Sequence, residues 1–158
     1  MSAIPLTAQG AERLKAELHR LKTVERPDVI NAIAEARAQG DLSENAEYDA
    51  ARERQAFVEG RIRELEGIIS NAQIIDPANL NVGDKIVFGA TVAIEDLDSG
   101  EQVTYQIVGD MESDIRENRI SVSSPVARAL IGKSEGDVVE VQAPGGVREF
   151  EIVTIEYR

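Results

Sequence analysis

The sequence predicts an α+β protein, in which an antiparallel helical coiled-coil hairpin is followed by a small β-rich domain with one short helix. Three observations lead to this prediction. Apolar residues recur at helical spacing in the first half, short β-branched runs separated by turn residues occupy the second half, and a stretch rich in Pro, Asn and Gly lies between them. We therefore divide the 158 residues into a hairpin over 1–75, a linker over 76–83 and a second domain over 84–158.

The first helix is expected to begin after Thr7, a residue type favoured at the N-cap. Its apolar residues fall at alternating steps of four and three, in two series whose frames differ. The two series are Leu14, Leu18 and Leu21, and Val29, Ile33 and Ala36. The change of frame surrounds Pro27, which lacks a backbone N–H, so we expect a kink or local distortion of the helix there.

Gly40 follows at the position where a left-handed glycine commonly ends a helix. A second helical pattern comes next, with the a/d spacing of a coiled coil. Its apolar residues are Val58, Ile62, Leu65, Ile69 and Ala72, extended backwards by Ala46, Ala50, Ala51 and Phe57. Two long helices joined by about four residues must run antiparallel, which places a tip near residues 40–48.

The second half contains six strand-like runs and one short helix. The runs are Lys85–Phe88, Thr91–Glu95, Gln102–Val108, Ile120–Val122, Val138–Gln142 and Val147–Glu156. The short helix is expected to have Ser124 at its N-cap, Pro125 at its first position and Gly132 just beyond its end.

Composition excludes several classes of function. The chain has no cysteine, which excludes disulfides and thiolate metal sites, and His19 is its only histidine. No apolar run is long enough to span a membrane and no secretory signal is recognisable, so we expect a cytoplasmic protein without a membrane partner. The net charge is −12, with 10 Lys or Arg and 13 Asp or Glu in residues 1–75. Phosphate backbones repel such a protein, so it should reach nucleic acid through a protein partner.

The tip contains four carboxylates within nine residues, among them Asp41 and Glu44. One interpretation is a capping box, with Asp41 as N-cap and Glu44 at the third helical position. The other is a pair of oxygen ligands for Mg²⁺, which often takes only one or two protein carboxylates. Two carboxylates on a thin tip would hold Mg²⁺ poorly alone, but they could complete a metal site on a partner.

The tip sequence from Gly40 to Tyr48 resembles the tip signature of the GreA/GreB transcript cleavage factors. The resemblance extends over the whole chain in ordered blocks and is nearer to the GreA branch. These blocks are Ile4-Pro5-Leu6-Thr7 with Gly10, Phe88-Gly89-Ala90-Thr91-Val92, Tyr105 to Asp110, Ile120-Ser121, Ser124 to Lys133, and Pro144-Gly145-Gly146.

The resemblance implies a fold and a function. The second domain would have a fold similar to FK506-binding proteins and would dock on the rim of the secondary channel of RNA polymerase. The hairpin would enter that channel, where Asp41 and Glu44 would help to hold an Mg²⁺ ion shared with the polymerase. The polymerase would then cleave its backtracked nascent RNA near the 3′ end, so the factor would stimulate the reaction without itself being an enzyme.

Lesser sites follow from the same resemblance. Arg37 and Arg52 flank the tip and would contact RNA phosphates, although a solvated helix surface also explains them. Ser121, Ser124 and Pro125 would lie near the polymerase-contacting surface, although the start of the short helix also explains Ser124 and Pro125. We expect a monomer, because one hairpin can bury its own seam. The alternative function is a regulator that occupies the channel and inhibits the polymerase without promoting cleavage.

Overall fold

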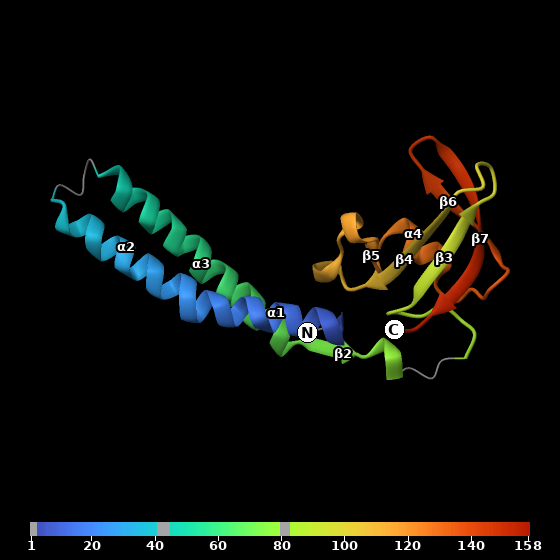
Figure 1. Cartoon of the computed structure of the whole chain (residues 1–158), viewed down its shortest axis with the longest axis horizontal. Helices are drawn as coiled ribbons and strands as arrows, with labels where there is room; N and C mark the ends of the chain where they lie inside the picture. Colours follow the sequence, from blue (N-terminus) through green and yellow to red (C-terminus); the bar gives the residue numbers. More distant parts are fainter. Residues whose placement is uncertain (1–2, 41–44, 80–82) are drawn as a thin grey trace. The chain divides into compact units, whose positions relative to one another are not determined.

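The computed structural model describes residues 3–40, 45–79 and 83–158 of the chain. These residues form two compact units, one over 11–72 and one that combines 3–10 with 73–158. The predicted fold class is confirmed, since a helical hairpin precedes a β-rich domain with a short α-helix (Figure 1). The second unit includes the N-terminal segment 3–10, which the sequence pattern did not indicate.

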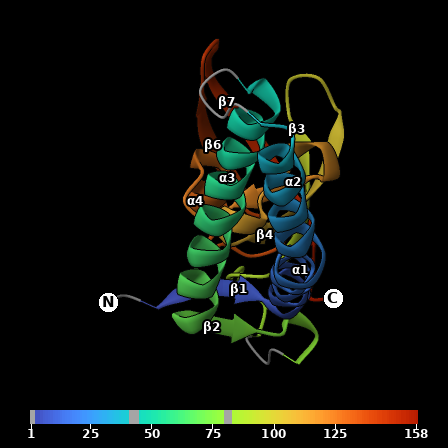
Figure 2. The same ribbon diagram turned by 90° about the vertical axis from the view of Figure 1, so that its left-hand side faces the viewer.

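The outgoing arm of the hairpin consists of α1 (Ala8–Arg20), a π-helical turn (Leu21–Glu25) and α2 (Arg26–Ala38). The distortion expected near Pro27 is this π turn, in which the Arg26 N–H donates to the carbonyl of Leu21, five residues back. The turn accommodates one extra residue, which explains the eight-residue step from Leu21 to Val29. The returning arm is α3 (Ala46–Ser70), and α2 and α3 lie side by side (Figure 2).

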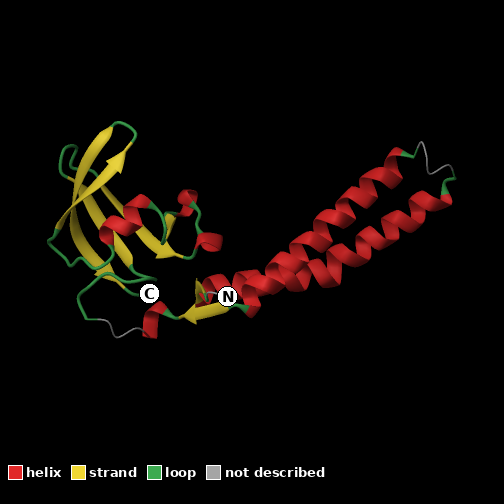
Figure 3. Ribbon diagram, turned by 180° about the vertical axis from the view of Figure 1, so that it is seen from behind, coloured by secondary structure: helices red, strands yellow, loops and turns green. Residues whose placement is uncertain are grey.

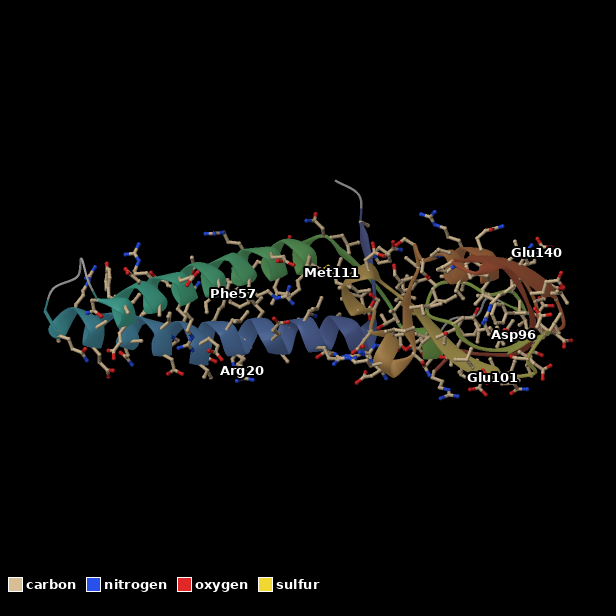
Figure 4. All side chains as sticks on the ribbon, turned by 90° about the horizontal axis from the view of Figure 1, so that it is seen from above. Arg20, Phe57, Asp96, Glu101, Met111 and Glu140 are labelled. Carbon is tan, nitrogen blue, oxygen red and sulfur yellow. The ribbon has the colours of Figure 1, made fainter. Side chains whose placement is uncertain are left out.

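The seam between the arms is a single line of buried apolar side chains. It comprises Leu14, Leu21, Val29, Ile33 and Ala36 from the outgoing arm, and Ala51, Val58, Ile62, Leu65 and Ile68 from α3. Several predictions for the seam of α3 are wrong. Ala46, Ala50 and Phe57 are exposed, Phe57 at 70% (Figure 4), and Ile68 is more buried than Ile69. The reason is geometric, because an α-helix with 3.6 residues per turn drifts away from a strict 3.5-residue repeat. Ala72 lies beyond the helix, which ends at Ser70, and begins strand β2 (Ala72–Ile75).

Ion pairs between the arms flank this seam. The Arg26 guanidinium donates two 2.8 Å hydrogen bonds to the Glu59 carboxylate, and Arg61 donates bonds of 2.7 and 2.9 Å to Glu17. Arg54 also pairs with Glu25 at 2.6 Å. Bidentate pairs of this kind attract the two arms to each other and also fix their register.

The second unit is built on a five-stranded sheet of order β5-β4-β3-β7-β6. Its strands are β3 (Thr91–Asp96), β4 (Gln102–Val108), β5 (Arg119–Ser121), β6 (Val138–Ala143) and β7 (Gly146–Glu156). Only β4 and β5 pair in parallel, and all other neighbours are antiparallel. The short helix α4 (Pro125–Leu130) packs beside the sheet and contributes Ala127 and Leu130 to its core (Figure 3).

The predicted strand at Lys85–Phe88 is wrong. Lys85 forms only an isolated bridge with Ser134, and the backbone of Ile86 bonds to Lys133 and Gly132. Ile86 itself is fully buried, so its apolar character reflects the core and not membership of the sheet.

Two strands were not predicted. They are β1 (Ile4–Thr7) and β2 (Ala72–Ile75), and they pair with each other. The predicted linker contains a 3₁₀ turn, Pro77–Asn79, in which Pro77 is buried. Within the described parts of the chain, none of the helices has the length and apolar character needed to cross a membrane.

Candidate functional site

The outgoing arm ends at the residue expected from the sequence. Gln39 is the C-cap of α2, and Gly40 follows with a φ of +111°. The Gly40 N–H donates to the carbonyl of Arg37 at 3.3 Å. A positive φ is readily adopted only by glycine, so Gly40 allows the chain to leave the helix sharply at this point.

The returning arm begins at Asn45, four residues later than the predicted N-cap. The Asn45 Oδ1 accepts a 3.0 Å hydrogen bond from the Tyr48 N–H, as an N-cap does. Its Nδ2 donates to the carbonyl of Ala36 at 2.7 Å, which joins the start of α3 to the last turn of α2. The capping-box interpretation is therefore wrong for α3, because Asn45 performs the capping that it assigned to Asp41.

The two predicted Mg²⁺ ligands, Asp41 and Glu44, lie outside the described residues. They belong to the four-residue connection between Gly40 and Asn45. Their carboxylate oxygens are the donor type that Mg²⁺ prefers. In the described remainder of the chain, no group of three or more histidine or acidic side chains is placed to hold a metal ion.

Beside the tip, one of the two predicted RNA-contacting arginines, Arg37, lies over an aromatic ring. The Arg37 guanidinium lies 6.0 Å from the centre of the Tyr48 ring. Arg37 and Arg52 hold the pKa of the Tyr48 hydroxyl below its usual value of 10.0, first through hydrogen bonding from Arg37 and then through the positive charge of both groups. The sequence analysis did not single out Tyr48. The signal was its position four residues before Arg52, on the same face of α3.

A groove of about 280 Å³ lies next to this cluster, within the hairpin. Arg37 and Arg52 form part of its wall, Ile30, Ile33 and Ala34 supply apolar surface, and Gln55 adds a side-chain amide. Ile30 is 51% exposed, so part of the apolar wall faces water. The groove therefore combines cationic, apolar and amide groups at the tip end of the hairpin.

One predicted docking residue of the second unit, Ser121, belongs to a hydrogen-bonded cluster with Asp110 and Ser123. The hydroxyls of Ser121 and Ser123 both donate to Asp110 Oδ1, the second at 2.8 Å. These hydroxyls hold the pKa of Asp110 below its usual value of 3.8, Ser121 having the larger effect. Asp110 and Ser123 were not predicted, since their role depends on the fold bringing β5 beside the Asp110–Glu112 turn.

Ser124 and Pro125 have the structural roles that the sequence allowed. The Ser124 Oγ accepts a 3.3 Å hydrogen bond from the Ala127 N–H and caps α4, whose first residue is Pro125. Ser121 lies close to this helix start, since its carbonyl accepts a 2.9 Å hydrogen bond from the Ser124 N–H. These residues belong to the second unit, whereas Arg37 and Arg52 belong to the hairpin unit.

Comparison with known proteins identifies close relatives over the whole length. The family model described as "Transcription elongation factor, N-terminal" matches residues 4–74, and "Transcription elongation factor, GreA/GreB, C-term" matches residues 81–157. The chain is 65% identical over 158 residues to the transcription elongation factor GreA of Verminephrobacter eiseniae, with all of both chains covered. It is 67% identical over 157 residues to that of Alkalilimnicola ehrlichii, with 99% of each covered.

Solved structures of similar sequence exist as well. The crystal structure of GreA factor homolog 1 (Gfh1) of Thermus thermophilus is 33% identical to this chain. The match covers 98% of this chain and 99% of that one, with a TM-score of 0.44.

Proposed function

Since the chain belongs to the GreA/GreB family of transcription elongation factors, we propose that it rescues stalled transcription by stimulating RNA polymerase to cleave its own backtracked RNA. The chain is a GreA-type elongation factor in sequence over its full length. In this proposal it is not itself an enzyme. It acts in the cytoplasm as a monomer that lends side chains to the active site of the polymerase.

The observation that best supports this proposal is the way the hairpin ends. Gly40 terminates α2 and Asn45 is the N-cap of α3, so the N-cap role that the sequence allowed for Asp41 belongs to Asn45. This leaves the Mg²⁺-ligand interpretation of the tip carboxylates as the one we propose. The 25 residues of α3 correspond to about 37 Å of helix, which suits delivery of the tip into a narrow channel.

In the proposed mechanism, the hairpin enters the secondary channel of the polymerase and presents Asp41 and Glu44 beside the RNA 3′ end. These carboxylates would complete an Mg²⁺ site shared with the polymerase, and they would orient the attacking water. Mg²⁺ bound there would stabilise negative charge on the attacking and leaving oxygens of the phosphodiester. Arg37 and Arg52 would contact phosphates of the RNA, and the surface around Ser121, Ser124 and Pro125 would dock on the channel rim.

The test is a stalled, backtracked elongation complex containing 3′-labelled RNA and Mg²⁺. Wild-type protein is compared with the Asp41→Asn/Glu44→Gln double variant, which removes the charges but keeps the side-chain shapes. We expect wild type to release a labelled 3′ fragment, and the variant to bind the polymerase without releasing one. Equal cleavage by both proteins would overturn the assignment of the carboxylates. No cleavage by either protein, with binding intact, would favour an inhibitory occupant of the channel.

A further inference from the structure

A pocket of about 420 Å³ belongs entirely to the second unit. Three of the residues that line it, Thr91, Gln106 and Arg119, lie side by side on β3, β4 and β5. They are direct partners across the sheet, Thr91 with Gln106 and Gln106 with Arg119. The next residues along β4 and β5, Ile107 and Ile120, pack in the core, and successive side chains of a strand point to opposite faces. The pocket therefore lies on the face of the sheet opposite to the core.

The wall of this pocket is made of hydrogen-bonding side chains. Among the described residues that line it, none is apolar or aromatic. Two arginines, three amide side chains and two threonine hydroxyls can donate hydrogen bonds into the pocket, and Glu117 adds a carboxylate. Residues 73–158 contain seven Lys or Arg against 16 Asp or Glu, and two of the seven, Arg119 and Arg158, lie here. Because cations and donors predominate, the pocket suits an anion with several accepting oxygens.

Arg119 is held in position by the protein itself. Its side chain is only 18% exposed, its Nε donates to the carbonyl of Glu112 at 3.2 Å, and its Nη1 pairs with Glu117. A guanidinium has five N–H donors, so these two bonds leave donors on Nη1 and Nη2 for a ligand. An arginine that is already fixed by its neighbours also loses little conformational freedom on binding.

Asn118 adds an amide to the wall at a position where the backbone favours glycine. It is the only non-glycine residue in the described parts of the chain with a positive φ, 57°. Its N–H donates to the carbonyl of Ile115 at 3.1 Å, and its carbonyl accepts from the Gln106 N–H at 2.9 Å. Glycine would adopt this conformation with less strain and could make both backbone bonds. What asparagine adds is a side-chain amide that lines the pocket.

We propose that this pocket binds a small phosphate-bearing molecule, with phosphate oxygens on Arg119 and Arg158. Guanidinium donors match phosphate oxygens in geometry and charge. A tetrahedral phosphate presents oxygens in several directions, which suits donors from three strands better than a planar carboxylate does. The pocket is larger than one phosphate group, so its amides are free to bind a second phosphate or the hydroxyls of a sugar. A nucleobase is not favoured, because the described wall offers no aromatic ring for stacking.

The first test locates the site by NMR. The full-length protein is titrated with inorganic pyrophosphate in a buffer without divalent cations, at constant ionic strength so that screening does not change. We expect saturable shifts of the backbone amide signals of Gln106, Asn118 and Arg119, and no shifts in α3. Shifts without saturation, or shifts spread over all basic surfaces of the protein, would overturn the proposal.

A pair of matched variants tests the role of charge. Arg158 and Arg116 are both exposed, at 69% and 88%, and each pairs with a nearby carboxylate, but only Arg158 lines the pocket. Arg158→Gln should weaken pyrophosphate binding about tenfold in calorimetry, and Arg116→Gln less than about twofold. Equal losses in the two variants would show a general effect of net charge and contradict a built site.

Two further variants have effects of opposite sign. Asn118→Gly keeps the positive φ and removes only the amide, so it should weaken binding about threefold without lowering the melting temperature. Glu117→Gln removes the negative charge from the wall and should strengthen binding about threefold. Unchanged affinity in Asn118→Gly, or weaker binding in Glu117→Gln, would contradict the proposed arrangement.

The kind of ligand is distinguished by comparing probes. Pyrophosphate and ribose 5-phosphate are titrated separately, and the tighter of the two identifies a diphosphate or a phosphorylated sugar as the ligand class. Sulfate that binds as tightly as both would identify a site for an adventitious ion only and would overturn the proposal. The Asp41→Asn/Glu44→Gln double variant should bind pyrophosphate as wild type does, so this site is tested independently of transcript cleavage.

Discussion

Asn45 joins the two arms of the hairpin with a single side chain. Its oxygen accepts from the Tyr48 N–H and its nitrogen donates to the carbonyl of Ala36, so it caps α3 and satisfies an end carbonyl of α2 at once. The last four carbonyls of a helix lack partners within the helix. The bond to Ala36 therefore stabilises the end of α2, as the bond from Tyr48 stabilises the start of α3. The side chain therefore defines where the tip begins.

We expect Asn45→Ala to lower the free energy of unfolding by about 1 kcal/mol, because both bonds are lost. Asn45→Asp keeps the accepting oxygen but loses the donor to Ala36, and should cost less. Urea denaturation followed by circular dichroism measures both variants. An unchanged midpoint in Asn45→Ala would mean that the cap contributes nothing to stability.

Glu112 is a second residue with a role that depends on distant partners. The residue is 8% exposed, and its carboxylate accepts hydrogen bonds from the backbone N–H groups of Thr7 and Gly109, at 3.0 and 2.9 Å, and from the Thr7 hydroxyl. The Thr7 hydroxyl in turn accepts from the Gly10 N–H. Gly10 is small by necessity, because a Cβ there would lie 1.8 Å from Glu112 Oε1.

Glu112→Ala should destabilise the protein by about 1–3 kcal/mol, since it leaves buried donors without partners. Gly10→Ala should also destabilise it, by displacing the carboxylate. Because both act through one contact, Gly10→Ala should cost clearly less in the Glu112→Ala background than in wild type. Thermal unfolding of wild type, the two single variants and the double variant measures this coupling, and additive losses of stability would contradict it.

Gly60→Ala should instead stabilise α3, because a Cβ at this position meets nothing within 4 Å.

At the level of whole elements, ion pairs between the arms make hairpin stability depend on acid. Arg61 lowers the pKa of Glu17, and Arg26 lowers that of Glu59, mainly through hydrogen bonds to the charged carboxylates. A pKa lowered by folding contributes stability that is fully present above the unfolded value, here about 4.5, and is lost as pH falls through the folded value. These side chains are partly exposed, so each contribution is modest.

We therefore expect helix content to become less resistant to urea as the pH is lowered below about 4.5. The double variant Glu17→Gln/Glu59→Gln should lose less stability over this range than wild type, although it starts from a lower value. Glu35→Gln is a suitable control, because Glu35 is exposed on α2. If the double variant and wild type respond equally to acid, these pairs do not account for the sensitivity.

For the molecule as a whole, the division of the chain does not follow the order of the sequence. Residues 3–10 belong to the second unit together with 73–158, although α1 continues from them into the hairpin. Strand β1 pairs with β2, and Thr7 bonds to Glu112, which is 105 residues away. A fragment that begins at residue 73 therefore lacks part of its own domain.

The fragment 73–158 should unfold at a lower temperature than the second unit of the intact chain. Glu112→Ala should cost less in this fragment than in the full-length protein, because the donors of Thr7 are already absent. A synthetic peptide of residues 3–10 should raise the melting temperature of the wild-type fragment, but not that of its Glu112→Ala variant. Calorimetry would contradict the argument if the substitution cost the same in both contexts.

Local patterns in the sequence were sufficient to predict the hairpin, the end of α2 at Gly40, the distortion near Pro27 and five strands of the sheet. Each depends on spacing or on the backbone preference of a single residue, which short-range physics determines. The family resemblance that supplied Asp41 and Glu44 is confirmed at the level of the family, while their role remains a prediction. The sequence analysis missed Tyr48 because its contact with Arg37, a residue of the other arm, exists only in the folded hairpin.

By itself, therefore, the sequence determined the two kinds of architecture and where the hairpin turns, because periodicity and helix-ending residues act locally. Only the tertiary structure decided that Asn45 caps α3, that Ile86 enters the core without joining the sheet, and that the first residues of the chain complete the second unit. These outcomes depend on partners far away in the sequence. Glu112 illustrates the physical reason: a buried carboxylate must find donors wherever the fold places them, and here it finds them in Thr7.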